Sequence, residues 1–201
     1  MKIVFFGDSI TDADRDRQNP NDLGDGYVKI AASKLRPLYP DCPPEIINRG
    51  VGGDRTEQLL KRVKGDVVEE QPEVVVMEVG INDVWSRFTG GPVVTPEEFR
   101  NNYAALVDTI KGTGAKLLLL QPYLLKVMDK QRLRPVLNEF NKIICEIAAR
   151  EKVTLIALDE IFTGVTQDIA ASQFAADGIH PTHRGCRYIA DLVIKELKKI
   201  L

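Results

Sequence analysis

The sequence predicts one α/β domain built on a doubly wound parallel sheet. Over 201 residues, five short β-rich runs alternate with five stretches of helical periodicity, and this alternation is typical of a parallel sheet. The third and fourth runs are apolar at consecutive positions, 74–77 and 117–120, as expected for strands covered by helices on both faces. A chain of this length favours a single core, so we take 1–201 as one domain.

The predicted strands are 2–6, 45–48, 73–79, 115–121 and 153–158, and the predicted helices are 27–38, 55–70, 96–110, 134–150 and 182–201. The third helix has the clearest start, because Thr95 can cap it, Pro96 suits its first position and Glu98 completes a capping box. Residues 12–26 are rich in Asp, Asn and Gly and have no periodicity. They predict a long surface loop, and loops of this length are often functional.

The charge balance argues against nucleic acid or an anionic membrane as a partner, since 27 Lys+Arg face 29 Asp+Glu for a net charge of -2. The apolar run before Gly7 is too short for a signal-peptide core. The three cysteines, Cys42, Cys145 and Cys186, are odd in number and lack C-x-x-C spacing, which favours structural thiols in a reducing compartment. We therefore expect a cytoplasmic protein without membrane or nucleic-acid partners; a homo-oligomer stays open.

Chemically useful side chains follow the predicted strands. Ser9 follows the first strand, Asn82 follows the third, and Asp177 and His180 lie in the last loop before the final helix. In a doubly wound sheet, ligands bind beyond the carboxyl ends of the strands, so these residues should meet at one edge.

These residue types are those of a serine hydrolase. A serine hydroxyl needs a base, and Asp177, three residues before His180, can orient the imidazole. Asn82 and the backbone N–H groups of Gly53 and Ser9 can stabilise an oxyanion, since the glycine turn 50–53 lets bare backbone approach a substrate. Such chemistry requires no cofactor, and the expected partner is a small-molecule ester.

The chain resembles the SGNH (GDSL-type) hydrolase superfamily of esterases and lipases. The four motif blocks of that family match, in order, residues 7–11, 48–54, 80–83 and 177–181. The resemblance implies Ser9, Gly53, Asn82 and His180 as the named quartet, with Asp177 as third member of the triad. It also implies a flavodoxin-like α/β/α sandwich with strand order 2-1-3-4-5.

A narrower similarity concerns residues 7–12 together with 80–85, which are similar to bacterial acetylesterases acting on acetylated xylo-oligosaccharides. It implies that Trp85, the only tryptophan, lines the substrate pocket, where its ring can stack on a sugar. Packing of Trp85 under a loop is an equally open interpretation. Within the superfamily, a lysophospholipid or thioester is the alternative substrate.

Two more distant alternatives remain. Asp177, His180 and His183 have metal-ligand residue types at helical spacing, and activity that is insensitive to EDTA would exclude a metal-dependent hydrolase. The turn 50–53 could instead cradle an anion at a helix start. Against this, the sequence lacks a P-loop motif, and a nucleotide titration would distinguish the two classes.

Overall fold

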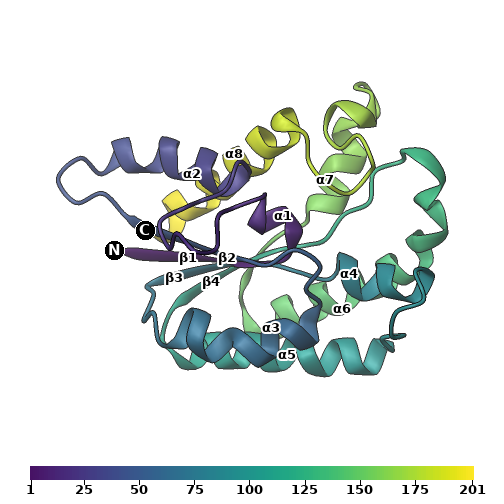
Figure 1. Ribbon diagram of the computed structural model, residues 1–201, viewed down its shortest axis with the longest axis horizontal. Coiled ribbons are helices and arrows are strands. Elements are labelled where there is room, and N and C mark those ends of the chain that lie inside the picture. The colour runs from purple at the N-terminus through teal and green to yellow at the C-terminus, as the bar shows by residue number, and fades with distance from the viewer.

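A parallel sheet forms the centre of the molecule (Figure 1). The computed structural model describes residues 1–201, apart from the side chains of Met128 and Asp129. The strands are β1 (Lys2–Gly7), β2 (Glu45–Gly50), β3 (Val74–Glu78), β4 (Lys116–Leu120) and β5 (Thr154–Ile156). Their order is β2-β1-β3-β4-β5 and each neighbouring pair is parallel, so the predicted strand order is confirmed.

Helices cover both faces of the sheet, which makes three layers as predicted (Figure 1). One layer contains α2 (Tyr27–Leu35), α7 (Leu158–Val165) and α8 (His183–Ile200), and the other contains α3 (Thr56–Val63), α5 (Pro96–Gly112) and α6 (Arg134–Glu151). Every residue of β3 is buried. Full burial of one such apolar side chain stabilises the fold by about 1.5–3 kcal/mol, so the two helical layers explain the continuous apolar runs in the sequence.

Two one-turn helices begin directly after central strands. They are α1 (Ser9–Asp12), after β1, and α4 (Ile81–Trp85), after β3. Neither was predicted, because a single turn is too short to show helical periodicity. Short turns of other helix types are η1 (Arg36–Leu38), η2 (Lys64–Val68), η3 (Ser86–Phe88), η4 (Met128–Leu133) and η5 (Ala171–Gln173).

Two predicted helices end earlier than expected. Helix α2 stops before Pro37, whose ring removes a backbone donor, and the chain continues as the 3₁₀ turn η1. Helix α3 passes into the π turn η2, in which the Glu69 N–H donates to the Lys64 carbonyl at 2.9 Å. The buried apolar positions of α3, Leu59 and Val63, continue to Val67 in η2. Sequence periodicity therefore could not separate α3 from η2.

The fifth predicted strand is too long. Residues 153–158 were expected to be extended, but β5 covers only Thr154–Ile156, and the buried Leu158 begins α7. Strand β5 is an edge strand that pairs only with β4. A short apolar run does not distinguish a strand from the start of a buried helix.

The predicted surface loop is anchored in the interior at both ends. Asp12 is buried and ends α1, and the Asn48 side chain donates to the carbonyls of Thr11 at 2.7 Å and Leu23 at 2.8 Å. The expectation of a surface loop over 12–26 was therefore wrong at its ends. Its middle, around Pro20, is exposed as predicted.

The capping box of α5 is present as predicted. The Glu98 N–H donates to Thr95 Oγ1 at 3.1 Å, and the Thr95 N–H donates to the Glu98 carboxylate at 2.8 Å. Within the residues that the structure describes, no helix combines the length and apolar character needed to span a bilayer.

Candidate active site

Ser9 is the first residue of α1, at the carboxyl end of β1. Asp8 caps this helix, since its Oδ1 accepts a hydrogen bond from the Ile10 N–H at 3.0 Å. A Cβ on Gly7 would lie 2.3 Å from the Glu78 carbonyl oxygen, so only glycine allows β1 and β3 to approach this closely at their ends. The close contact between the ends of β1 and β3 fixes where the chain leaves the sheet, two residues before Ser9.

His180 faces Ser9, although 171 residues separate them in the chain. Its Nε2 lies 3.0 Å from Ser9 Oγ, and its Nδ1 lies 2.9 Å from Asp177 Oδ2. The structure therefore brings together the serine, histidine and aspartate that the sequence singled out. An imidazole so placed can accept the hydroxyl proton while the carboxylate stabilises the resulting charge.

The Asp177 turn is built to keep its carboxylate ionised. Asp177 Oδ1 accepts from the backbone N–H groups of Ile179 at 2.9 Å and His180 at 2.8 Å. Partial burial would raise the pKa of Asp177, but the hydrogen bonds from His180, from these N–H groups and from Lys130 outweigh it and hold the pKa below its usual range. Asp177 is thus negatively charged at neutral pH.

Lys130 is a neighbour of Asp177 that sequence reasoning missed. Its Nζ lies 3.0 Å from Asp177 Oδ2, the oxygen that also contacts His180. The same ammonium group lies 5.1 Å from the centre of the Trp85 ring, within the range of a cation–π interaction. Because Lys130 comes from the short turn η4, 47 residues before Asp177, no spacing in the sequence linked them.

A hollow of about 320 Å³ opens beside the serine. The residues lining it are Ser9, Ile10, Ala13, Asp14, Asp25, Gly26, His180, Pro181 and Cys186. Asp14 and Asp25 are exposed, so two carboxylates border the space next to the hydroxyl. The structure places Trp85 at the end of α4, half-buried and beneath Lys130; its contact with substrate stays a prediction.

The glycine turn after β2 lies against the serine. A Cβ on Gly52 would lie 3.8 Å from Ser9 Cβ, and Gly53 has a φ of +85°, which favours glycine. The Gly52 N–H donates to Asp12 Oδ2 at 2.8 Å. Because a carboxylate of the chain already occupies the Gly52 N–H, this N–H is not available to a phosphate or another external anion.

Asn82 connects the segment that carries Ser9 to the glycine turn. Its Nδ2 donates to the Asp54 carbonyl at 3.0 Å and lies 3.4 Å from Asp8 Oδ2. The next residue, Asp83, accepts from the backbone N–H of Thr56 and from its Oγ1, the latter at 2.6 Å. Asp8 and Asp83 therefore brace helix starts, and burial raises the pKa of Asp83 to about 6 despite the Thr56 hydrogen bonds.

The three residues considered for a metal site, Asp177, His180 and His183, are not arranged as a set of metal ligands. Both ring nitrogens of His180 already face Ser9 and Asp177, and His183 is exposed at the start of α8. Among the side chains that the structure describes, no three His, Cys, Asp or Glu residues form a group that could hold a metal ion.

Glu78 is a second residue that the sequence reasoning missed. It ends the central strand β3 and is completely buried, as is Asp8. Burial, followed by the neighbouring Asp8 carboxylate, raises the pKa of Glu78 well above its usual value, and burial raises that of Asp8 to about 6. A glutamate inside an otherwise apolar run was the available signal.

Comparisons with known proteins agree with this fold. The model of the GDSL-like Lipase/Acylhydrolase family matches residues 5–188. An acetylxylan esterase of Geobacillus stearothermophilus is 26% identical over 98% of this chain and 93% of its own. The thioesterase 1/protease 1/lysophospholipase L1 of Escherichia coli is 24% identical over 89% of this chain and 81% of its own. A solved GDSL-like lipase from Parabacteroides merdae has a TM-score of 0.91 at 28% identity, covering 96% of this chain and 94% of its own.

The fold and these relatives define an enzyme that hydrolyses carboxylic esters. More narrowly, the chain belongs to the GDSL-like lipase/acylhydrolase family, whose model covers most of its length.

We expect Glu78→Gln to become progressively more stable than the unmodified protein as pH rises. The folded pKa of Glu78 lies above its ordinary value of 4.5, so its contribution to stability is complete below that pH and is lost as pH rises through the folded pKa. Glutamine keeps the shape without titrating. The melting-temperature difference between the two proteins should therefore widen as the pH rises above about 5.

The matched control is Glu97→Gln, because Glu97 is an exposed glutamate in the first turn of α5. An equal pH trend in both variants would contradict a raised pKa for the buried Glu78.

Proposed function

We propose that this protein is a serine esterase that acts through an acyl-enzyme on small acyl esters, chiefly acetyl esters of carbohydrates such as acetylated xylo-oligosaccharides. The observation that carries the proposal is the hydrogen-bonded row from Ser9 Oγ through His180 to Asp177, with contacts of 3.0 and 2.9 Å. This row has the geometry that an activated serine needs.

In the proposed mechanism, His180 Nε2 takes the proton of Ser9 Oγ, which attacks the ester carbonyl carbon. The carbonyl electron pair moves to oxygen, then returns as the C–O bond to the alcohol breaks, and His180 gives its proton to the leaving alcohol. Water repeats the sequence on the acyl-enzyme and releases the acid. Asp177 stabilises the imidazolium throughout, and the chemistry needs no cofactor.

Three N–H groups of the proposed site bind the oxyanion: Asn82 Nδ2–H, the Gly53 N–H and the Ser9 N–H. One hydrogen of the Asn82 amide is held by the Asp54 carbonyl at 3.0 Å, whereas its contact with Asp8 is longer, at 3.4 Å. The hydrogen facing Asp8 is therefore the more weakly held of the two and the one that is available to the oxyanion.

The hollow beside Ser9 favours a small acyl group on a polar alcohol. Its volume of about 320 Å³ is at the lower end of ligand pockets. Asp14 and Asp25 can accept hydrogen bonds from sugar hydroxyls, whereas a fatty chain would leave these carboxylates against hydrocarbon. Trp85 offers a flat ring for a pyranose face. The acetylxylan esterase relative supports the same substrate class.

A thioesterase or lysophospholipase activity is the second candidate, because the Escherichia coli relative is named as both a thioesterase and a lysophospholipase.

The cytoplasmic location stays a prediction, as does the small-molecule ester as partner.

Ser9→Ala should abolish both ester hydrolysis and labelling by a fluorophosphonate probe, because the variant lacks the attacking oxygen. In-gel fluorescence and a p-nitrophenyl acetate assay measure the two effects. Ser86→Ala is the control: Ser86 is a nearby serine whose Oγ donates to the Pro92 carbonyl at 2.7 Å, and its loss should spare both readouts. Labelling that survives in Ser9→Ala and disappears in Ser86→Ala would place the nucleophile at Ser86.

Asn82→Ala should lower kcat by about 10²–10³, the usual effect of losing one oxyanion donor. The comparison variant is Asn102→Ala, which removes an amide of the same size that donates to Thr56 Oγ1 at 3.3 Å. Its kcat should stay within about threefold of the unmodified protein. Equal kcat values for the two variants would contradict the role of Asn82 as an oxyanion donor.

Chain-length preference tests the substrate class. Among p-nitrophenyl acetate, butyrate and octanoate, the acetate should have the highest kcat/KM, since the hollow is small and bordered by carboxylates. A preference for octanoate would overturn the carbohydrate proposal in favour of the lipolytic one, while leaving the serine mechanism intact.

A further inference from the structure

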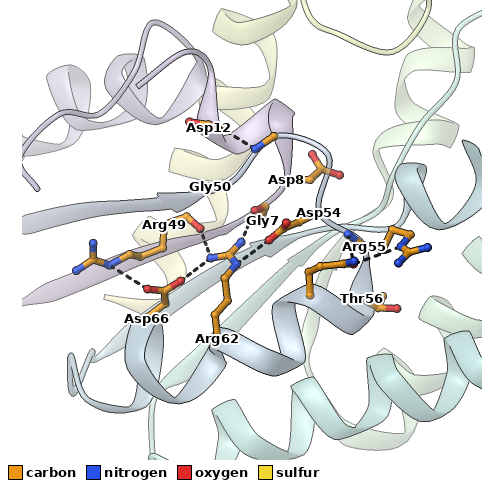
Figure 2. Close-up of polar contacts among 12 residues, drawn as sticks. Gly7, Asp8, Asp12, Arg49, Gly50, Asp54, Arg55, Thr56, Arg62 and Asp66 are labelled. Atoms are coloured by element: carbon orange, nitrogen blue, oxygen red, sulfur yellow. Dashed lines mark hydrogen bonds and ion pairs between the residues drawn. The ribbon is translucent and has the colours of Figure 1, made fainter. Parts of the chain in front are cut away.

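Arg62 joins several segments of the site at one guanidinium group. Its side chain extends from α3 to the carboxyl ends of β1 and β2 (Figure 2). Nη2 donates to the Gly7 carbonyl at 2.8 Å, and Nη1 donates to the Arg49 carbonyl at 2.7 Å. Nε donates to Asp54 Oδ2 at 2.7 Å, and Nη1 also donates to Asp66 Oδ2 at 2.6 Å. One planar group thus holds four acceptors.

The acceptors frame the proposed oxyanion hole. Gly7 lies two residues before Ser9, and Arg49 is the last residue before the glycine turn. Asp54 follows Gly53, and its carbonyl is the acceptor for the Asn82 amide. Arg62 therefore sets the distance between the segment that carries Ser9 and the turn that carries Gly53, and it does so on both sides of that turn.

These hydrogen bonds are partly shielded from water. The side chains of Arg62 and Asp54 are 19% and 13% exposed, and the guanidinium carbon lies 4.5 Å from the centre of the Phe6 ring. Charge-assisted hydrogen bonds in such surroundings are stronger than neutral ones and less screened by salt.

The geometry requires arginine. Three different nitrogens of a rigid fork reach four acceptors that lie in different directions. A lysine ammonium is a single point with three donors on a flexible stem, so it cannot hold both carbonyls and both carboxylates at once.

We propose that Arg62 is a positioning residue for catalysis: through Asp54 and the two strand-end carbonyls, it fixes the Gly53 and Asn82 donors relative to Ser9. The inference rests on the proposed function, in which these donors bind the oxyanion. Arg62 does not itself touch the substrate. Oxyanion donors act only when they are held close to their productive geometry, within about 0.5 Å.

The test is a double-mutant cycle with Arg62→Met and Asn82→Ala, measured by kcat and KM on p-nitrophenyl acetate. Arg62→Met alone should lower kcat by about 10–100-fold with KM within about threefold, because donors are misplaced in the transition state. In the Asn82→Ala background, Arg62→Met should lower kcat by less than about a third of that factor, since one donor positioned by Arg62 is already absent.

Arg49→Met is the matched control. The Arg49 side chain belongs to the same ionic network, bonded to Glu70 at 2.5 Å, and is 22% exposed, while the carbonyl that Arg62 uses is retained. Its kcat should stay within about threefold of the unmodified protein, even where its melting temperature falls as far as that of Arg62→Met. Arg62→Lys keeps the charge and serves where the methionine variant fails to fold; its kcat should still fall by about tenfold.

Equal kcat losses in the Arg62 and Arg49 variants, or fully additive effects in the cycle, would overturn the role of Arg62. If Asn82→Ala alone leaves kcat unchanged, the proposed oxyanion hole fails instead, so the two failures are distinguishable.

Discussion

The parallel direction of the strands is the constraint on which the whole site depends. Because β1, β2 and β3 all end at one edge, the segments that follow them are brought together there, and Arg62 of α3 then holds them in place. Ser9, the glycine turn and Asn82 each occupy the first residues after a strand. His180 reaches the same edge from the loop before α8 and meets Ser9 at 3.0 Å. Residues that are far apart in the sequence are therefore close in space because the ends of their strands are adjacent.

The buried base of the site holds more carboxyl groups than its chemistry requires. Asp8 and Glu78 are buried side by side beneath the serine, and Asp83 is buried at the start of α4. Their raised pKa values mean that ionisation here is costly, and the lowered pKa of Asp177 stands in contrast. One carboxylate is solvated by N–H donors and Lys130, while the others are held in dry surroundings. Environment, and not residue type, separates the carboxylate that contacts His180 from the carboxyl groups that brace the backbone.

The sequence was sufficient for the fold and for the residues that stand in motifs. Consecutive apolar positions in β3 and β4 required a covered sheet, and Asp177 and His180 are close enough in the chain to be read as one unit. Residues whose function depends on distant contacts could not be found in this way. Lys130 comes from a short turn, Glu78 shows in the sequence only as a glutamate in an apolar run, and Arg62 looks like an ordinary cation on the polar side of α3. Each becomes significant only through partners that the fold supplies.

The two chain ends lie together, away from the site. Lys116, at the start of β4, donates through Nζ to the Ile200 carbonyl, and the N-terminus begins β1 at this same edge of the sheet (Figure 1). Ser9 and His180 occupy the opposite edge. A resin, surface tag or fused carrier attached at either end would therefore face away from Ser9 and His180, so tethering this domain should leave the hollow beside Ser9 unobstructed.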